Sequence, residues 1–215
     1  VQMDSEGVAV ITAQQIDGGT TDNCGTGPLT YSASQTSFTA PGSYTVTLTV
    51  TDASGNSSSC AATVIVADPE PPVAICQPDT IYLNNAGQAS ITALDINGGS
   101  TDNDTIVSYT ASQYNIDCSN LANNGANNVV LTVTDASGNT DNCTAVVTVL
   151  DTIAPTVICH NLTVTLPASG HVPVTAAQLN NGSTDNCGSG TLTYSASSTL
   201  FAHAGSFPDT LTVTD

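Results

Sequence analysis

Residues 48–56 read LTVTDASGN, and the same nine residues recur at 131–139. A third copy begins at Leu211 as LTVTD. Aliphatic side chains alternate with threonine in this phrase, a pattern typical of a strand with one buried face and one solvated face. The Asp, Ser, Gly and Asn that follow favour a tight turn, and we expect the next strand in AATVIVAD and in TAVVTVLD. The phrase therefore predicts a hairpin built on a buried aliphatic strand.

Other landmarks repeat with the same period as this phrase. Cys60 and Cys143 are 83 residues apart, as are Cys76 and Cys159. The phrases DGGTTDNC, NGGSTDND and NNGSTDNC also align, and prolines follow an aspartate in VADPEPPVAIC and VLDTIAPTVIC, which favours short, stiff connections there. We therefore predict three tandem domains and expect the chain to be a window from a longer array. The expected domains are 1–67 without its first strand, 68–150 complete, and 151–215 without its last strand.

Each repeat offers a further early strand, which we expect at 8–13, 89–93 and 172–176. No stretch shows helical periodicity with caps. Several short strands separated by Gly, Asn and Asp turns within about 83 residues indicate an all-β fold. The predicted architecture is a tandem array of immunoglobulin-like β-sandwich repeats.

The strongly negative charge of the chain bears on which partners it can bind. It carries 18 acidic side chains and no Lys or Arg, so no carboxylate can pair with either of these bases. Nucleic acids and anionic membrane surfaces are bound through basic side chains, so the composition argues against both as partners. No apolar run reaches transmembrane length, and we expect any export signal to lie outside these residues. Seven cysteines indicate an oxidising, extracellular setting.

The order of these motifs resembles the hyalin repeat, an immunoglobulin-like extracellular module. The entry motif appears at 72–76 and 155–159, the DNC loop at 22–24 and 185–187, and the exit motif at 51–60 and 134–143. The low Lys and Arg content, with NGSTDNCG and LTVTDASGN, is most similar to the repeat arrays of gliding-motility adhesins of Bacteroidota. This resemblance implies a cell-surface filament that grips a substratum.

The resemblance also implies how the cysteines pair. Its entry and exit cysteines form a disulfide, which here would join Cys76 to Cys143. Cys60 and Cys159 would then pair with residues outside the chain. NIDCSN around Cys118 resembles the second cysteine that follows the DNC loop in related repeats, but Asp104 stands where the loop of the same repeat would have its cysteine. The remaining cysteines could therefore be free or could bridge between chains. The residues left open in this way are Cys24, Cys118 and Cys187.

Acidic residues recur at three places in each repeat, which an immunoglobulin-like topology brings to one pole of the domain. These places are the linker, the TDN loop and the turn after the repeated strand. Because no basic side chain can relieve their repulsion, we predict interdomain calcium sites. The alternative is that these residues only form tight turns, which Asp and Asn favour without metal. The candidate ligands are Asp68, Glu70 and Asp151 in the linkers, Asp22, Asp102, Asp104 and Asp185 in the loops, and Asp52, Asp135 and Asp215 in the turns.

We expect no enzymatic activity. The three histidines occur only in the last repeat, without a nucleophile or acid at informative spacing, and one catalytic site would rarely be needed in every repeat. The predicted function is that of an extracellular stalk or adhesin segment, whose partners are neighbouring repeats, identical chains in a filament, and a surface or glycan ligand. The alternative is a self-assembling extracellular fibre or matrix protein. A carbohydrate-binding module is disfavoured because the chain has no Trp and only 4% aromatic residues.

Overall fold

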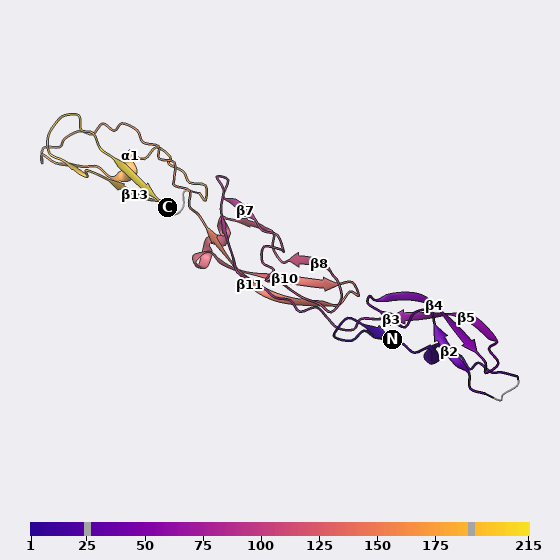
Figure 1. The fold of residues 1–215 in the computed structure, drawn as a ribbon. Coiled ribbons are helices and arrows are strands. Elements are labelled where there is room, and N and C mark those ends of the chain that lie inside the picture. The colour runs from indigo at the N-terminus through magenta and orange to yellow at the C-terminus, as the bar shows by residue number, and fades with distance from the viewer. Residues whose placement is uncertain (24–26, 189–191) are drawn as a thin grey trace. The chain divides into compact units, whose positions relative to one another are not determined.

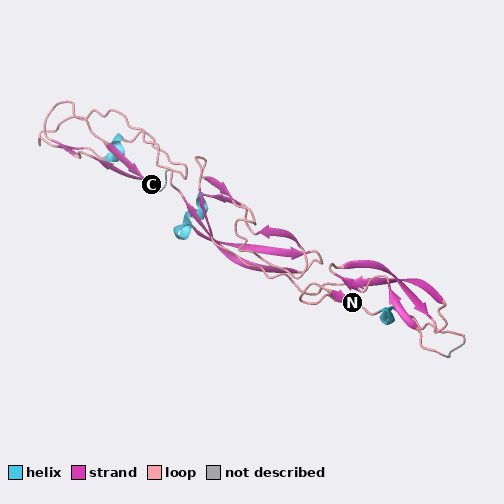
Figure 2. Cartoon of the chain, in the orientation of Figure 1, coloured by secondary structure: helices cyan, strands magenta, loops and turns pink. Residues whose placement is uncertain are grey.

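A computed structural model describes residues 1–23, 27–188 and 192–215 (Figure 1). Strands make up most of the regular structure in the described residues, and the helical segments are short (Figure 2). The fold is therefore all-β, as the sequence predicts. The chain forms two compact units, each assembled from several segments. Unit 1 contains residues 1–77, 92–112 and 129–145, and unit 2 contains residues 78–91, 113–128 and 146–215.

Unit 1 is built mainly from antiparallel pairs. Strand β1 pairs with β3, β4 pairs with both β2 and β5, and β8 pairs with the second part of β10. Its core contains Met3, Phe38 and Val46 among other buried side chains. Its elements are β1 (Ala9–Val10), η1 (Ala13–Ile16), β2 (Thr30–Ala33), β3 (Ser37–Phe38), β4 (Gly42–Thr51), β5 (Ser57–Val66) and β8 (Ile106–Ala111), with parts of β10 (Ala126–Asp135) and β11 (Thr140–Leu150).

Unit 2 contains the remaining parts of β10 and β11. Strand β6 pairs in parallel with the end of β11, and the antiparallel pairs are β7 with β9, β12 with β14, and β13 with β15. One core cluster consists of Leu83, Ile116 and Val149. The elements are β6 (Asp79–Tyr82), β7 (Gln88–Ser90), β9 (Asn115–Asp117), η2 (Cys118–Gly125), β12 (Val172–Pro173), α1 (Ala176–Leu179), β13 (Thr193–Ala196), β14 (Leu200–Phe201) and β15 (Leu211–Thr214).

The repeated phrase forms the strands that the alternation predicts. In β4, Val46 and Leu48 are almost fully buried, and in β10 Leu131 and Val133 are completely buried. The turn after β4 leads into β5, whose Ser57 lies opposite Thr51. The predicted hairpin is confirmed. Its two strands extend beyond the repeated phrase, since β4 and β5 pair from Gly42 opposite Val66 to Thr51 opposite Ser57.

The early strands are shorter than predicted, and a helical turn follows two of them, β1 and β12. Thr12 precedes η1 and Thr175 precedes α1, and each begins a capping box with the glutamine three residues later. The Thr12 N–H donates to Gln15 Oε1 at 2.7 Å, and the Thr175 N–H donates to Gln178 Oε1 at 2.9 Å. These short turns are stabilised by local polar contacts, which a search for helical periodicity does not detect.

The predicted domain boundaries after residues 67 and 150 each fall inside one compact unit. The three-domain division therefore stays a prediction. The carboxylates that cluster near the first boundary, Asp68, Asp102 and Asp135, all lie in unit 1, and those near the second, Asp151 and Asp185, both lie in unit 2.

Candidate metal centre

Three carboxylates from distant parts of the sequence come together in unit 1. Asp68 follows β5, Asp102 lies in the TDN loop, and Asp135 is the last residue of β10. Their ligand oxygens all lie within 4.8 Å of one another. We call these residues, with Asn103 and Asp104, the first linker site. The sequence predicts this convergence from the three recurring acidic positions.

Hydrogen bonds hold the first linker site in place. Asp68 Oδ1 accepts from the Glu70 N–H at 3.1 Å and from Asn103 Nδ2 at 3.3 Å. The Asn139 N–H donates to Asp135 Oδ1 and its Nδ2 to Asp135 Oδ2, both at 2.8 Å. Asn139 Nδ2 also reaches the main-chain carbonyl of Asp68 at 3.0 Å. The DASGN turn thus fixes its own aspartate and ties it to the linker, so the turn interpretation and the metal interpretation apply to the same residue.

The site keeps oxygen atoms that have no hydrogen-bond partner. Asp68 is only 5% exposed and Asp135 only 1% exposed, yet the chain has no Lys or Arg to balance their charge. The buried atoms without a partner here are Asp68 Oδ2, Asp102 Oδ1, Asn103 Oδ1 and Asp104 Oδ2. A buried carboxylate oxygen without a partner is costly. An all-oxygen set of this kind fits a hard divalent cation such as calcium.

Asp102 shows the electrostatic cost most clearly. Burial raises the pKa of its carboxyl, and the neighbouring charges of Asp135, Asp68 and Asp104 raise it further. The Asp104 N–H, which donates to Asp102 Oδ2 at 3.1 Å, acts in the opposite direction on this pKa. A bound cation would remove this repulsion by pairing with the ionised form.

A second cluster lies in unit 2 and contains Asp151, Asp185 and Cys187, whose ligand atoms also lie within 4.8 Å of one another. We call these residues, with Asn186, the second linker site. Asn186 Nδ2 donates to Asp151 Oδ1 at 3.1 Å, and the Cys187 N–H donates to Asp185 Oδ2 at 3.0 Å. Asp185 Oδ1 and Asn186 Oδ1 are buried without a partner. This site has sulfur where the first has a carboxylate.

Five predicted ligands are not among the clustered carboxylates of the described residues, and one of them, Asp104, donates its N–H to the clustered Asp102. Glu70, Asp22 and Asp215 are exposed, and Glu70 contributes main-chain atoms rather than its carboxylate to the first linker site. Asp52 caps its own turn, where hydrogen bonds from the Asn56 side chain and main chain lower the pKa of its carboxyl. For Asp52, the turn interpretation accounts for every contact that the structure describes.

The cysteines form two disulfides in the described residues. Cys76 is bonded to Cys143, which is the pairing that the resemblance implies. Cys118 is bonded to Cys187. Cys60 and Cys159 are free and exposed. Cys24 lies outside the described residues.

Sequence reasoning missed two features of these sites. It left Cys118 and Cys187 without a pairing. NIDCSN around Cys118 resembles the partner of a DNC cysteine, but the loop of the same predicted repeat has Asp104, and Cys187 belongs to the next one. It also gave no role to Asn103 and Asn186, although an asparagine follows the loop aspartate in all three TDN phrases. That recurrence is the signal that could have identified them.

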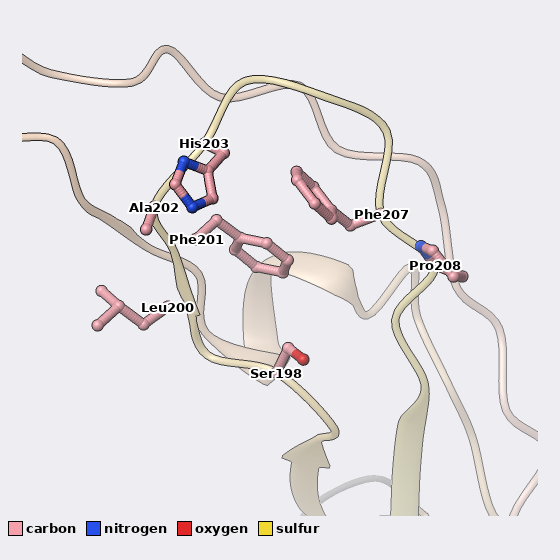
Figure 3. A pocket seen from close by; sticks show the side chains of 7 residues that line it. All are labelled: Ser198, Leu200, Phe201, Ala202, His203, Phe207 and Pro208. Atoms are coloured by element: carbon pink, nitrogen blue, oxygen red, sulfur yellow. The ribbon is translucent and has the colours of Figure 1, made fainter.

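A separate open cavity of about 360 Å³ lies in unit 2, and Figure 3 shows the side chains around it. The rings of Phe201 and Phe207 are 5.4 Å apart at a tilt of 42°. The lining residues are Ser198, Leu200, Phe201, Ala202, His203, Phe207 and Pro208. The cavity offers apolar and aromatic surface without a carboxylate, so it differs in chemistry from both linker sites.

In the described residues, no helix is long and apolar enough to cross a membrane. The chain matches no family model and no curated protein.

Among solved structures, the chain is similar to protocadherin gammaB7 EC3-6, with 21% identity, a TM-score of 0.30, and coverage of 79% of this chain and 56% of that one. It is also similar to PcdhgB3 EC1-4, with 16% identity, a TM-score of 0.35, and coverage of 87% and 58%. For the human Desmocollin-1 ectodomain the identity is 17%, the TM-score 0.26, and the coverage 55% and 29%. The chain thus spans between about a third and three fifths of these structures.

Proposed function

We propose that this chain is a non-enzymatic stalk or adhesin segment outside the cell, made of tandem immunoglobulin-like repeats, with a calcium ion bound at the first linker site. The observation that carries this proposal is the first linker site. It gathers Asp68, Asp102 and Asp135 from a linker, a loop and a strand end, with buried oxygens that lack partners and no basic residue to neutralise them. The two disulfides support an oxidising, extracellular setting.

A calcium ion at this site would be held by carboxylate oxygens of Asp68, Asp102 and Asp135, with the buried, unpartnered oxygens Asn103 Oδ1 and Asp104 Oδ2 as candidate further ligands. It would neutralise their mutual repulsion and fix the linker against the loop and the hairpin turn. Repetition of such linkers would keep an array stiff and allow many weak contacts with a surface or glycan ligand to add up. The resemblance to adhesin arrays of gliding Bacteroidota supports a role in gliding motility at the cell surface.

Thermal unfolding of the full chain in calcium and in chelator tests the metal site. A ligand at 100 times its dissociation constant stabilises the folded state by about 2.7 kcal/mol. We therefore expect calcium to raise the melting temperature of unit 1, and calorimetric titration to show binding.

The variant Asp68→Asn/Asp102→Asn removes two carboxylates of the cluster and should abolish both effects. The matched control is Asp95→Asn, because Asp95 is an exposed aspartate that accepts a 2.7 Å hydrogen bond from the Thr92 N–H through an oxygen that asparagine also offers. An unchanged melting temperature and no heat of binding for the unsubstituted chain would contradict the calcium proposal.

The self-assembling fibre remains the second candidate, because Cys60 and Cys159 are free and exposed. Exposed thiols can form disulfides between chains in an oxidising compartment. A covalent ladder in non-reducing electrophoresis that disappears in Cys60→Ser/Cys159→Ser would favour the fibre. A single monomer species in sedimentation and electrophoresis would favour the stalk.

A further inference from the structure

The two linker sites share one backbone scaffold. In the first, Asn103 Nδ2 donates to Asp68 Oδ1 at 3.3 Å, and in the second, Asn186 Nδ2 donates to Asp151 Oδ1 at 3.1 Å. The residue after each asparagine donates its N–H to the preceding loop aspartate, at 3.1 Å and 3.0 Å respectively. Asp104 and Cys187 therefore occupy the same place in the two scaffolds. The two clusters also differ at Asp135, whose counterpart in the repeat, Asp215, is exposed and is not part of the second cluster.

The turn that faces each asparagine is also repeated. Asn103 Nδ2 donates to the carbonyl of Asp4 at 3.0 Å, and Asn186 Nδ2 donates to the carbonyl of Asn84 at 3.2 Å. Each of these carbonyls also accepts from a glycine three residues later, Gly7 and Gly87, at 2.9 Å and 2.8 Å. Both glycines have positive φ, +75° and +68°. The same turn therefore receives the same loop in both units.

The strand pairs beside these turns identify the counterpart of Cys118 in unit 1. In unit 2, Ile116 of β9 lies opposite Ala89, and Cys118 is two residues after Ile116. In unit 1, Phe38 of β3 lies opposite Ala9, and Ala40 is two residues after Phe38. Cys118 Sγ lies 3.5 Å from the carbonyl oxygen of Gly87, which places it at the repeated turn. The equivalent residue pairs are therefore Ala40 with Asp104, and Cys118 with Cys187.

We propose that the residues at these two equivalent positions determine whether a cation or a disulfide fastens the linker to its loop. At the second linker site, the Cys118–Cys187 disulfide replaces the cation. This inference rests on the calcium site of the proposed function. With Asp104, the first site keeps an all-oxygen donor set. In the described residues, the second cluster contains two carboxylates, Asp151 and Asp185, and a sulfur already bonded to Cys118 is a poor ligand for a hard cation.

Forming the disulfide removes one proton and one electron from each thiol. A small disulfide such as oxidised glutathione accepts them by exchange and becomes two thiols. The fastening at the second site therefore depends on redox conditions, whereas the fastening at the first depends on the concentration of a divalent cation. One scaffold thus responds to two different extracellular variables.

The decisive variant is Ala40→Cys/Asp104→Cys in the full chain, refolded with reduced and oxidised glutathione. Peptide mapping without reductant should show a 40–104 disulfide beside the 118–187 disulfide. Calcium affinity should fall roughly 10- to 100-fold or more, and chelator should no longer lower the melting temperature of unit 1. The matched control, Ala40→Ser/Asp104→Ser, has hydroxyls in place of both thiols and should lose calcium affinity without gaining resistance to chelator.

The unsubstituted chain and Asp151→Asn/Asp185→Asn complete the test. We expect one calcium ion per chain in both, because the second site carries none. Binding of a second ion that is lost in Asp151→Asn/Asp185→Asn would overturn the inference while leaving the calcium proposal intact, and so would failure of the folded cysteine variant to form the 40–104 disulfide. Absence of any calcium binding by the unsubstituted chain would instead overturn the proposed function.

Discussion

Asp102 shows the consequence of building a carboxylate cluster in a chain without basic residues. Its carboxyl loses hydration and faces three other carboxylates, and these effects raise its pKa. For an acid, a raised pKa means that the folded state holds the proton more tightly than the unfolded state. Ionisation of Asp102 therefore opposes folding when no cation is bound.

The first prediction concerns Asp102→Asn, which should change stability in opposite directions with and without metal. In chelator at pH 7 the variant should melt at a higher temperature than the unsubstituted chain, because asparagine removes a charge and keeps an acceptor for the Asp104 N–H. In calcium it should melt at a lower temperature, because a ligand is lost. Scanning calorimetry in both buffers measures the two differences, and the same sign in both would contradict the role given to Asp102.

The pH dependence follows from the same shift. In chelator, the advantage of Asp102→Asn should be full above the raised pKa and should disappear as the pH falls below the ordinary value of 3.8, where Asp102 is protonated in both states. Asp95→Asn is a control with the opposite sign, since hydrogen bonds from Thr92 lower the pKa of Asp95. Melting temperatures from pH 3 to pH 7 would separate the two variants.

Gly7 is a second residue whose chemistry is fixed by a close approach. Its φ is +75°, and a Cβ there would lie 2.1 Å from the carbonyl oxygen of Asn103. Gly170 occupies a similar turn with φ +77°, and a Cβ there would meet nothing within 4 Å. Both glycines have the left-handed conformation that residues with a side chain disfavour. Of the two, only Gly7 lies so close to another part of the chain that an added Cβ would collide with it.

The second prediction compares Gly7→Ala with Gly170→Ala. The conformational strain should cost about 1 kcal/mol in each case, whereas Gly7→Ala should cost several kcal/mol in total because the Asn103 loop must move. Gly7→Ala should also weaken calcium binding, since Asn103 holds Asp68. Urea unfolding and calcium titration of both variants would check this, and equal losses would show that the close contact is unimportant.

At the scale of single elements, the strands β4 and β10 contain the first residues of the two full copies of the repeated phrase, and both copies lie in unit 1. Their inward aliphatic side chains are buried, and Leu131 has no exposed surface. The outward threonines occupy the more accessible face, as the alternation requires. Burial of a leucine of this kind is among the larger single contributions to the stability of a domain.

The third prediction is that Leu131→Ala lowers the free energy of unfolding by about 2–5 kcal/mol, because it leaves a cavity in a packed core. Thr132→Ala, on the opposite face of the same strand, should cost about 1 kcal/mol or less. Denaturant unfolding followed by circular dichroism measures both. Equal effects of the two substitutions would contradict the assignment of the buried face.

The sequence predicts elements whose signal is periodic and misses those held by individual contacts. The alternation in residues 44–51 and 128–135 was sufficient to predict β4 and β10, and three recurring acidic positions were sufficient to place Asp68, Asp102 and Asp135 together. By contrast, η2 is not a regular helix, because Asn123 and Asn124 within it have φ values of 54° and 58°. Its sequence shows no helical periodicity of apolar residues. The Cys118–Cys187 bond depends on the position of that segment, so pairing by motif could not reveal it.

At the scale of the whole molecule, Cys76–Cys143 closes a large loop around the central part of the chain. The two cysteines are 67 residues apart in sequence. In the chain-entropy model, a bond across a loop of this length stabilises the folded state by about 4 kcal/mol, because it restricts the unfolded chain.

The fourth prediction is that Cys76→Ser/Cys143→Ser lowers the free energy of unfolding by an amount of that order. Cys60→Ser is the matched control, because Cys60 is exposed and unbonded and its loss should change stability by no more than about 0.5 kcal/mol. Both are compared by urea unfolding without reductant. A loss as small as that of the control would show that the bond adds little.

The two disulfides overlap along the chain, since Cys118 lies inside the loop that Cys76–Cys143 closes. The shortest covalent route from Cys76 to Cys187 crosses to Cys143, runs back 25 residues to Cys118, and crosses again, whereas the main chain between the same ends covers 111 residues. If the protein were pulled from its ends, unfolding would therefore leave 86 residues, or about 300 Å of contour length, that extend in full only after both bonds are reduced. Under load, the extended length of the protein would therefore increase when a reducing agent breaks the two overlapping bonds.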